Sequence, residues 1–245
     1  EIAQGKGFSP SSLGNYLRNP MQFYFQRVLS IRDVDEVEEN IALNTLGTIV
    51  HNTLEDLYRP HLGKLITVAI LDAMILQVPE TLDLHFKQVY SKTNERLGKN
   101  LLAMEVARQN VLFFLTKEKE DVSAGSQLEV LSLEDDLSVL IEDPKLPYSV
   151  RIAGKADRIE RRNGKIRIID YKTGSVLAGD VKLKDFDLLL DGVKYEKVIQ
   201  LLCYALMSKE KFPLEDVEVG IYSFKNKKTG FLLFEWDKNG SVITA

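Results

Sequence analysis

The sequence has little cysteine, no visible signal-peptide pattern and no long uncharged apolar run, and each observation argues against a class of protein. One cysteine, Cys203, excludes an internal disulfide and any zinc or iron–sulfur site ligated by several cysteines. The longest apolar run, residues 65–78, is interrupted by Asp72 and is too short to cross a bilayer. No phosphate-binding loop of the pattern G-x-x-x-x-G-K-[ST] occurs. We therefore expect a cytoplasmic protein with no ATPase site in this chain.

The length and composition of the chain are those of a folded globular domain. The 245 residues are 44% hydrophobic and 28% charged, which is enough for one full core. The formal net charge of −4 argues against a generally basic surface, but phosphate contacts need only local positive charge. Because the chain begins at Glu1 rather than methionine, we expect a single domain, residues 1–245, excised from a longer protein.

Residues 154–174, GKADRIERRNGKIRIIDYKTG, predict a β-hairpin. Asn163-Gly164 lies between two runs that alternate isoleucine with charge, and both central residues of a type I′ turn need positive φ. A two-residue loop fixes the register and places Asp157 opposite Asp170. Because side chains alternate between faces, both aspartates share a face with Ile159, Ile166 and Ile168.

The two aspartates and the lysine that follows them form a charged cluster at one end of this face. Opposed carboxylates repel one another unless a cation lies between them, and a divalent metal would stabilise them. The alternative is a solvated hairpin end, where lysines neutralise the aspartates. The order D…D-x-K favours the metal, because Lys172 would lie one strand step beyond two oxygen ligands and could orient a water.

Asp157 followed by Asp170-Tyr171-Lys172 resembles the core of the PD-(D/E)xK nucleases, and the flanking residues resemble the branch of RecB, AddB and Cas4 nucleases. Three further stretches are similar to motifs of that branch and follow in the same order: SPSSLGNYLRNPMQFYF at 9–25, LGTIVHNTLEDLY at 46–58 and QLLCY at 200–204. The resemblance implies an α/β fold with a restriction-endonuclease-like core. Its central mixed β-sheet would be flanked by helices, with a helical insertion at about residues 62–120.

The resemblance also implies the metal site. The ligands would be His51, Asp157, Asp170 and the carbonyl of Tyr171, holding Mg²⁺ or Mn²⁺. An imidazole among oxygen ligands favours Mn²⁺. The cysteines that hold an iron–sulfur cluster in many relatives are missing: Asn19 stands before Pro20 where the first would be. We therefore expect no iron–sulfur cluster.

Catalytic and substrate-binding residues follow from the same resemblance. Asp157, Asp170 and Lys172 would carry the reaction, with Lys172 orienting the attacking water. Gln200 and Tyr204 would brace the site and contact the substrate. The sequence adds Lys155 and Arg158 as candidate DNA contacts, since both belong to the basic side chains that crowd the hairpin.

Each helix motif also has an ordinary structural interpretation. Residues 46–60 have the apolar spacing of an amphipathic helix, with His51 at the flank of the stripe, where a histidine is often structural or exposed. In the helix predicted at 195–209, Gln200 and Tyr204 project from one edge, and without the resemblance these two residues would indicate only an ordinary helix. The carboxylate pair elsewhere makes metal ligation the preferred interpretation of His51.

The predicted function is a Mg²⁺- or Mn²⁺-dependent deoxyribonuclease that hydrolyses phosphodiester bonds, and we expect it to act as an exonuclease. It would be the nuclease domain of a RecB- or AddB-like helicase–nuclease in DNA repair and recombination. The substrate would be single-stranded DNA or duplex ends, and the partner a helicase domain or subunit. The alternative is a catalytically inactive module that binds DNA or braces a helicase. A non-haem iron oxygenase is disfavoured, because none of the three histidines lies in an H-x-D pair.

Periodicity and turn residues predict the elements. Helices are expected at residues 46–60, 65–77, 80–91, 99–118 and 195–209, and a charged linker at 32–40. Strands are expected at residues 127–133, 137–142, 149–161, 165–172, 216–224 and 230–235.

Overall fold

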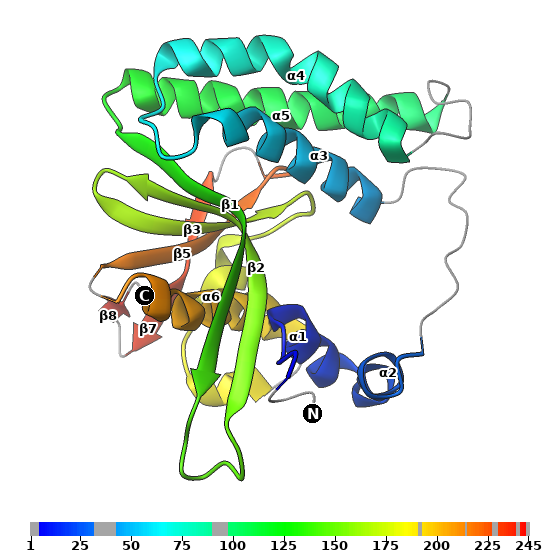
Figure 1. Ribbon diagram of the computed structural model, residues 1–245, viewed down its shortest axis with the longest axis vertical. Coiled ribbons are helices and arrows are strands. Elements are labelled where there is room, and N and C mark those ends of the chain that lie inside the picture. The colour runs from blue at the N-terminus through cyan, green and yellow to red at the C-terminus, as the bar shows by residue number, and fades with distance from the viewer. Residues whose placement is uncertain are drawn as a thin grey trace.

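The computed structural model places a five-stranded mixed sheet between two layers of helices (Figure 1). It describes residues 5–31, 43–89, 98–190, 193–213, 215–226, 230–238 and 241–243, and the charged linker predicted at 32–40 lies outside them. One layer contains α3 (Leu43–Tyr58), α4 (Val68–Val89) and α5 (Lys99–Ser123). The other contains α6 (Glu196–Lys211) with α1 (Pro10–Arg18) beside it. The predicted α/β class and mixed sheet are confirmed.

The strand order of the large sheet is β1-β2-β3-β5-β6. These strands are β1 (Leu128–Ile141), β2 (Val150–Arg162), β3 (Lys165–Lys172), β5 (Val217–Ser223) and β6 (Phe231–Leu233). Strands β3 and β5 are parallel, with α6 between them in sequence, and the other pairs are antiparallel. A smaller sheet contains β4 (Lys182–Leu183), β7 (Glu235–Lys238) and β8 (Ser241–Ile243). The short helical segments are α2 (Pro20–Phe23), η1 (Tyr24–Val28), η2 (Arg59–His61), η3 (Ala178–Val181), η4 (Phe186–Leu190) and η5 (Val193–Tyr195).

The hairpin has the register that its turn predicts. Pairing runs from Arg162 with Lys165 to Arg158 with Ile169, so Asp157 and Asp170 are the next residues beyond the last paired ones. The turn residues Asn163 and Gly164 have φ of 51° and 86°, as a type I′ turn requires. Since the two strands stop pairing at Arg158, the aspartates lie where the hairpin opens.

Two hydrophobic cores lie on the two faces of the sheet. On β3, Ile166 and Ile168 pack in the core beneath α6, whereas Ile169 and Tyr171 pack in the core beneath α3, α4 and α5. Asp170 continues the first series by strand alternation. Among the described residues, no helix combines the length and apolar character that a membrane span needs.

Two boundary predictions are wrong. The helices predicted at 65–77 and 80–91 form one helix, α4, which continues through Pro79. Val78 and Leu82 on either side of the proline are fully buried, so packing offsets the missing backbone hydrogen bond.

The strands predicted at 127–133 and 137–142 also form one element, β1. The acidic run Glu134-Asp135-Asp136, between the two predicted strands, lies within β1, and the strand pairs with β2 before and after Glu134. A register shift between Val130 and Ser132 precedes it. Such a bulge re-aims the side chains that follow.

Candidate metal centre

Three potential metal ligands converge where the hairpin opens. His51 of α3, Glu134 of β1 and Asp157 of β2 each present one ligand atom, and these atoms all lie within 4.8 Å of one another. Ligands of Mg²⁺ lie about 2.1 Å from the ion, so opposite ligands are about 4.2 Å apart. The three groups therefore fit one divalent ion after little movement.

The orientation of the His51 ring leaves one nitrogen available to a metal. Its Nε2 lies 3.1 Å from the carbonyl oxygen of Tyr171. Since a carbonyl only accepts hydrogen bonds, this contact requires the proton on Nε2 and leaves the lone pair on Nδ1. Nδ1 lies 3.6 Å from Asp157 Oδ2. Burial lowers the pKa of His51, which favours the neutral form that binds metals.

The two carboxylates of this group lie in surroundings that resist their ionisation. Burial raises the pKa of Asp157 well above its ordinary value, and the charge of Asp170 raises it further. A hydrogen bond of 2.6 Å from the Tyr171 backbone N–H to Asp157 Oδ2 acts in the opposite direction. Burial also raises the pKa of Glu134. A bound cation would offset both penalties, so this donor set fits the metal that the D…D-x-K pattern predicts.

Asp170 lies beside this group and is held by other side chains. It is 2% exposed, its Oδ1 accepts a 2.7 Å hydrogen bond from Gln200 Nε2, and its Oδ2 lies 2.7 Å from Lys172 Nζ. The Tyr204 hydroxyl lies 3.4 Å from Oδ1 and donates to the carbonyl of Lys155 at 3.0 Å. Asp170 is not in the 4.8 Å group. Its sharing of an ion with Asp157 stays a prediction.

Two predicted site residues contact the ligands in different ways. The Tyr171 carbonyl, predicted as a metal ligand, accepts a hydrogen bond from His51 and so orients that ring. The Lys155 side chain is 52% exposed, with Nζ 3.8 Å from Glu134 Oε2. Lys155 is therefore available to a phosphate close to the metal ligands.

The prediction that Arg158 contacts DNA is wrong. Arg158 is completely buried. Its Nη2 lies 2.5 Å from Glu160 Oε2 and 3.0 Å from Glu118 Oε2, and its Nη1 donates to the Tyr171 hydroxyl at 3.2 Å. Strand alternation gives the reason: the residue after Asp157 points to the other face of the sheet, beneath α5.

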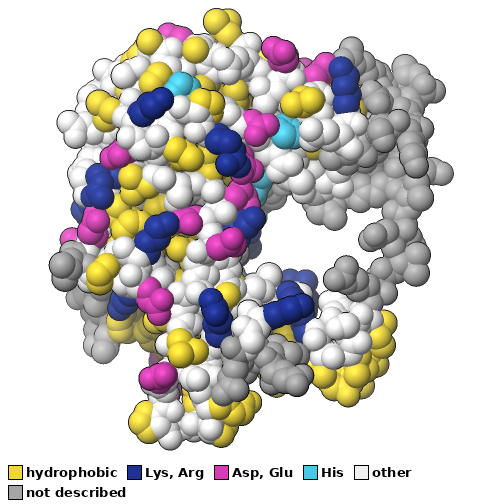
Figure 2. All heavy atoms as spheres, viewed as in Figure 1, with side chains coloured by type: hydrophobic (Ala, Val, Ile, Leu, Met, Phe, Trp, Pro, Cys, Tyr) yellow, Lys and Arg dark blue, Asp and Glu magenta, His cyan; other side chains and the backbone are white. Residues whose placement is uncertain are grey.

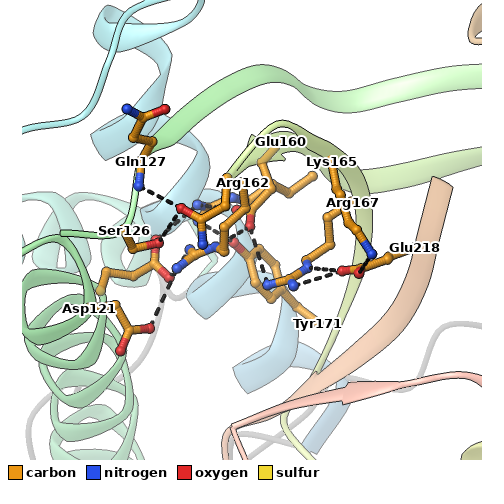
Figure 3. Close-up of polar contacts among 12 residues, drawn as sticks. Asp121, Ser126, Gln127, Glu160, Arg162, Lys165, Arg167, Tyr171 and Glu218 are labelled. Carbon is orange, nitrogen blue, oxygen red and sulfur yellow. Dashed lines mark hydrogen bonds and ion pairs between the residues drawn. The ribbon is translucent and has the colours of Figure 1, made fainter. Parts of the chain in front are cut away.

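The buried ion pairs continue from Arg158 to Arg162. Arg162 lies 2.7 Å from Glu160 and 2.5 Å from Glu118, and Figure 3 shows its neighbourhood at the end of β2. Because Glu118 belongs to α5, the pairs join that helix to the hairpin. Through the Tyr171 hydroxyl they also reach the residue whose backbone contacts both His51 and Asp157. This cluster of Arg158, Arg162, Glu118 and Glu160 is hereafter the buried ion cluster.

Glu134 is the candidate ligand that the sequence analysis missed. The register of β1 against β2 places it opposite Asp157, because Leu133 pairs with Arg158 and Asp135 pairs with Ala156. Its φ of 48° is unusual for glutamate and marks a local distortion of the strand. One feature of the sequence could have indicated Glu134: it is an acidic residue between two segments that were both predicted as strands.

We predict that Asp157→Asn stabilises the metal-free protein at neutral pH. A carboxyl whose pKa is raised on folding contributes stability below its ordinary pKa of about 3.9, and this is lost as pH rises through the folded-state pKa. Asparagine carries no such penalty and can still accept from the Tyr171 N–H. In EDTA, the variant should melt several degrees above wild type at pH 7 and equal it near pH 4.

The same variant should lose the stabilisation that Mn²⁺ gives to wild type. Thermal unfolding from pH 4 to pH 8, with EDTA or with Mn²⁺, measures both effects. If the variant melts below wild type at pH 7 in EDTA, ionisation of the buried Asp157 carboxylate does not destabilise the folded protein.

Comparisons with known proteins agree with this geometry. A family model described as the PD-(D/E)XK nuclease superfamily matches residues 7–242. An uncharacterized protein of Rickettsia conorii is 23% identical over 217 residues, covering 80% of this chain and 23% of its own length. One of Rickettsia bellii is 22% identical over 221 residues, covering 86% of this chain and 25% of its own length. The chain thus spans about a quarter of the length of these curated relatives.

A solved structure is also similar at a low level. The crystal structure of SSO0001 is 14% identical, covers 81% of this chain and 74% of its own, and aligns with a TM-score of 0.24. So weak an overlap supports no statement about this chain.

Proposed function

The chain belongs to the PD-(D/E)XK nuclease superfamily, and we propose that it is a deoxyribonuclease that uses a divalent metal. The observation that carries the proposal is the convergence of His51, Glu134 and Asp157 within 4.8 Å, beside the Lys172–Asp170 pair at 2.7 Å. His51, Glu134 and Asp157 would hold the ion, with Asp170 as a further carboxylate. This donor set of imidazole and carboxylates suits Mn²⁺ as well as Mg²⁺.

The side chains around the ligands supply the rest of the mechanism. When bound, the ion would lower the pKa of a water and offset the charge of the phosphate. The Lys172 ammonium would orient the attacking water and stabilise the negative charge that develops on the phosphate. Gln200 and Tyr204 would keep Asp170 in place through the contacts at 2.7 and 3.4 Å. Lys155 would contact a neighbouring phosphate.

We further propose an exonuclease that serves a RecB- or AddB-like helicase in DNA repair and recombination. The five sequence motifs, which follow one another in the order of that branch, support the proposal. The greater length of the curated relatives is compatible with additional domains, since this chain covers about a quarter of each. The partner would be a helicase domain or subunit, and the location the cytoplasm.

End-labelled single-stranded and double-stranded DNA, incubated with Mg²⁺, Mn²⁺ or EDTA, tests the function. We expect cleavage with either metal and none in EDTA, and mononucleotide or short products for an exonuclease. RNA of the same sequence should be cleaved more slowly if DNA is the substrate. DNA binding without cleavage under every metal condition would instead support the inactive module.

A further inference from the structure

A groove of about 340 Å³ lies between α1 and α6 and opens at the proposed active site. Its polar lining includes Ser11, Asn15 and Arg18 of α1 and Glu196 and Lys197 of α6. Lys172 and Gln200 also line it, and each contacts Asp170 at 2.7 Å. Figure 2 shows basic, acidic and histidine side chains at the margin of the hollow between the α3–α5 layer and α1. The groove is thus continuous with the residues that would act on the scissile phosphate.

Helix α1 is held firmly as one wall of this groove. The Phe8 N–H donates to the Arg151 carbonyl at 2.8 Å, and the Ala153 N–H donates to the Phe8 carbonyl at 2.9 Å. At Gly154, an added Cβ would lie 2.9 Å from Pro10 Cδ, so only glycine lets α1 approach β2 so closely. Gly154 therefore lets β2 fix the position of α1, and with it one wall of the groove.

The second wall approaches the first closely enough to limit what enters. A Cβ added at Gly14 would lie 3.4 Å from Glu196 Cγ, so α1 and α6 are in contact beside the groove. The groove beside this contact has a volume of about 340 Å³, which is too small to admit a DNA duplex. A single strand is narrow enough, and a wall that is already in place reduces the ordering cost of binding it.

The charged groups of the groove suit a phosphate backbone. Arg18 forms a two-point contact with Glu196, with Nε to Oε1 at 2.9 Å and Nη2 to Oε2 at 2.5 Å. The same planar guanidinium geometry matches a phosphate. The Arg18 side chain is 52% exposed, so the ion pair is weak and its partner can be exchanged. Lys197 is similarly paired with Asp180 at 3.3 Å.

We infer that this groove binds the backbone of a single DNA strand next to the scissile phosphate, with Arg18 as a phosphate contact that Glu196 occupies in the free protein. The inference rests on the proposed function and adds the strand specificity and its binding site. Binding would exchange the Arg18–Glu196 pair for an Arg18–phosphate pair. Glu196 therefore competes with the substrate.

The variants Arg18→Gln and Glu196→Gln distinguish this exchange from a structural ion pair. Both variants break the same pair, so a structural pair gives effects of the same sign. An exchanged pair changes the affinity for DNA in opposite directions in the two variants. Arg18→Gln should weaken binding about tenfold. Glu196→Gln should strengthen binding about twofold to fivefold, because a competing carboxylate is removed.

Fluorescence anisotropy of a labelled 15-nucleotide oligothymidylate in EDTA measures the binding without cleavage. In a salt titration, Arg18→Gln should also reduce the slope of log K against log salt by about 0.7, the value for one phosphate on a single strand. Arg161→Gln and Glu215→Gln are the matched controls. They break a two-point pair of 2.6 and 3.3 Å whose residues are absent from the groove lining, and binding should not change.

Wild-type cleavage, measured in parallel, separates this inference from the proposed function. If wild type cleaves DNA and the two variants shift binding in the same direction, the groove assignment is wrong and the nuclease stands. If wild type neither cleaves nor binds the oligonucleotide, both are wrong. A duplex whose binding is equally sensitive to Arg18→Gln would overturn the assignment to a single strand.

Discussion

Asp170→Ala or Lys172→Ala is expected to reduce DNA cleavage by about 10³-fold or more while leaving the chain folded. Removal of a single group that stabilises the charge of a transition state costs about 10² to 10³ in rate, and loss of a metal ligand adds to this. Lys172 Nζ lies 2.7 Å from Asp170 Oδ2, so each substitution removes one member of a single functional pair. Steady-state cleavage of end-labelled DNA measures the loss.

The fold should tolerate both changes. The Lys172 side chain is 35% exposed, so its truncation removes little buried surface, and Asp170 keeps its 2.7 Å hydrogen bond from Gln200. Removal of the Asp170 carboxylate relieves the repulsion that raises the pKa of Asp157. Gln200 Nε2 loses one acceptor but keeps the Tyr204 hydroxyl at 3.0 Å. Circular dichroism and thermal unfolding check this.

Lys165→Ala is the matched control for Lys172→Ala. Lys165 begins the same strand, at the opposite end from Asp170 and Lys172, and pairs at the surface with Glu218 at 3.3 Å. The control should cleave like wild type. Wild-type rates in a well-folded Asp170→Ala or Lys172→Ala protein would remove these residues from the catalytic mechanism.

Arg158→Met is expected to lower the free energy of unfolding by about 3–5 kcal/mol. Removing one partner of a buried ion pair leaves an uncompensated buried charge, and losses of that size are typical. Here Glu118 and Glu160 would lose a guanidinium 3.0 and 2.5 Å away, and the Tyr171 hydroxyl would lose its donor. Urea denaturation measures the change. For a domain of this size it corresponds to a fall in melting temperature of about 6–20 °C.

Two further variants show whether charge burial is the cause. Arg161→Met breaks an ion pair whose two side chains are 37% and 36% exposed, and it should cost about 1 kcal/mol or less. Arg158→Met combined with Glu160→Gln removes a charge of each sign and should be more stable than Arg158→Met alone. If Arg158→Met stays within about 1 kcal/mol of wild type, the buried ion cluster does not hold α5 to the hairpin.

The hairpin could be predicted from the sequence because its determinants are local. The Asn163-Gly164 turn sets the register, and strand alternation then places Asp157 and Asp170 without knowledge of the rest of the chain. The family motifs supplied His51, which lies more than one hundred residues earlier in sequence. The structure brings His51 to Asp157, with 3.6 Å between Nδ1 and Oδ2.

The errors concern residues whose place depends on distant partners. Arg158 looked like one of several basic surface residues, because its burial requires Glu118, which is contributed by a helix 40 residues away in sequence. Glu134 was missed because the sequence analysis ended one strand at residue 133 and began the next at residue 137, which left Glu134 outside both. The pairing with β2 on both sides, which no local pattern encodes, keeps this segment in the strand.

The most direct test of the metal centre is the anomalous diffraction of crystals soaked in Mn²⁺. The geometry predicts one strong peak about 2.1 Å from His51 Nδ1 and from a carboxylate oxygen of Asp157, with Glu134 or Asp170 completing the protein ligands. Crystals of Asp157→Asn, soaked in the same way, should lack the peak. A wild-type crystal whose Mn²⁺ binds elsewhere, with His51 and Asp157 outside its coordination sphere, would contradict the account.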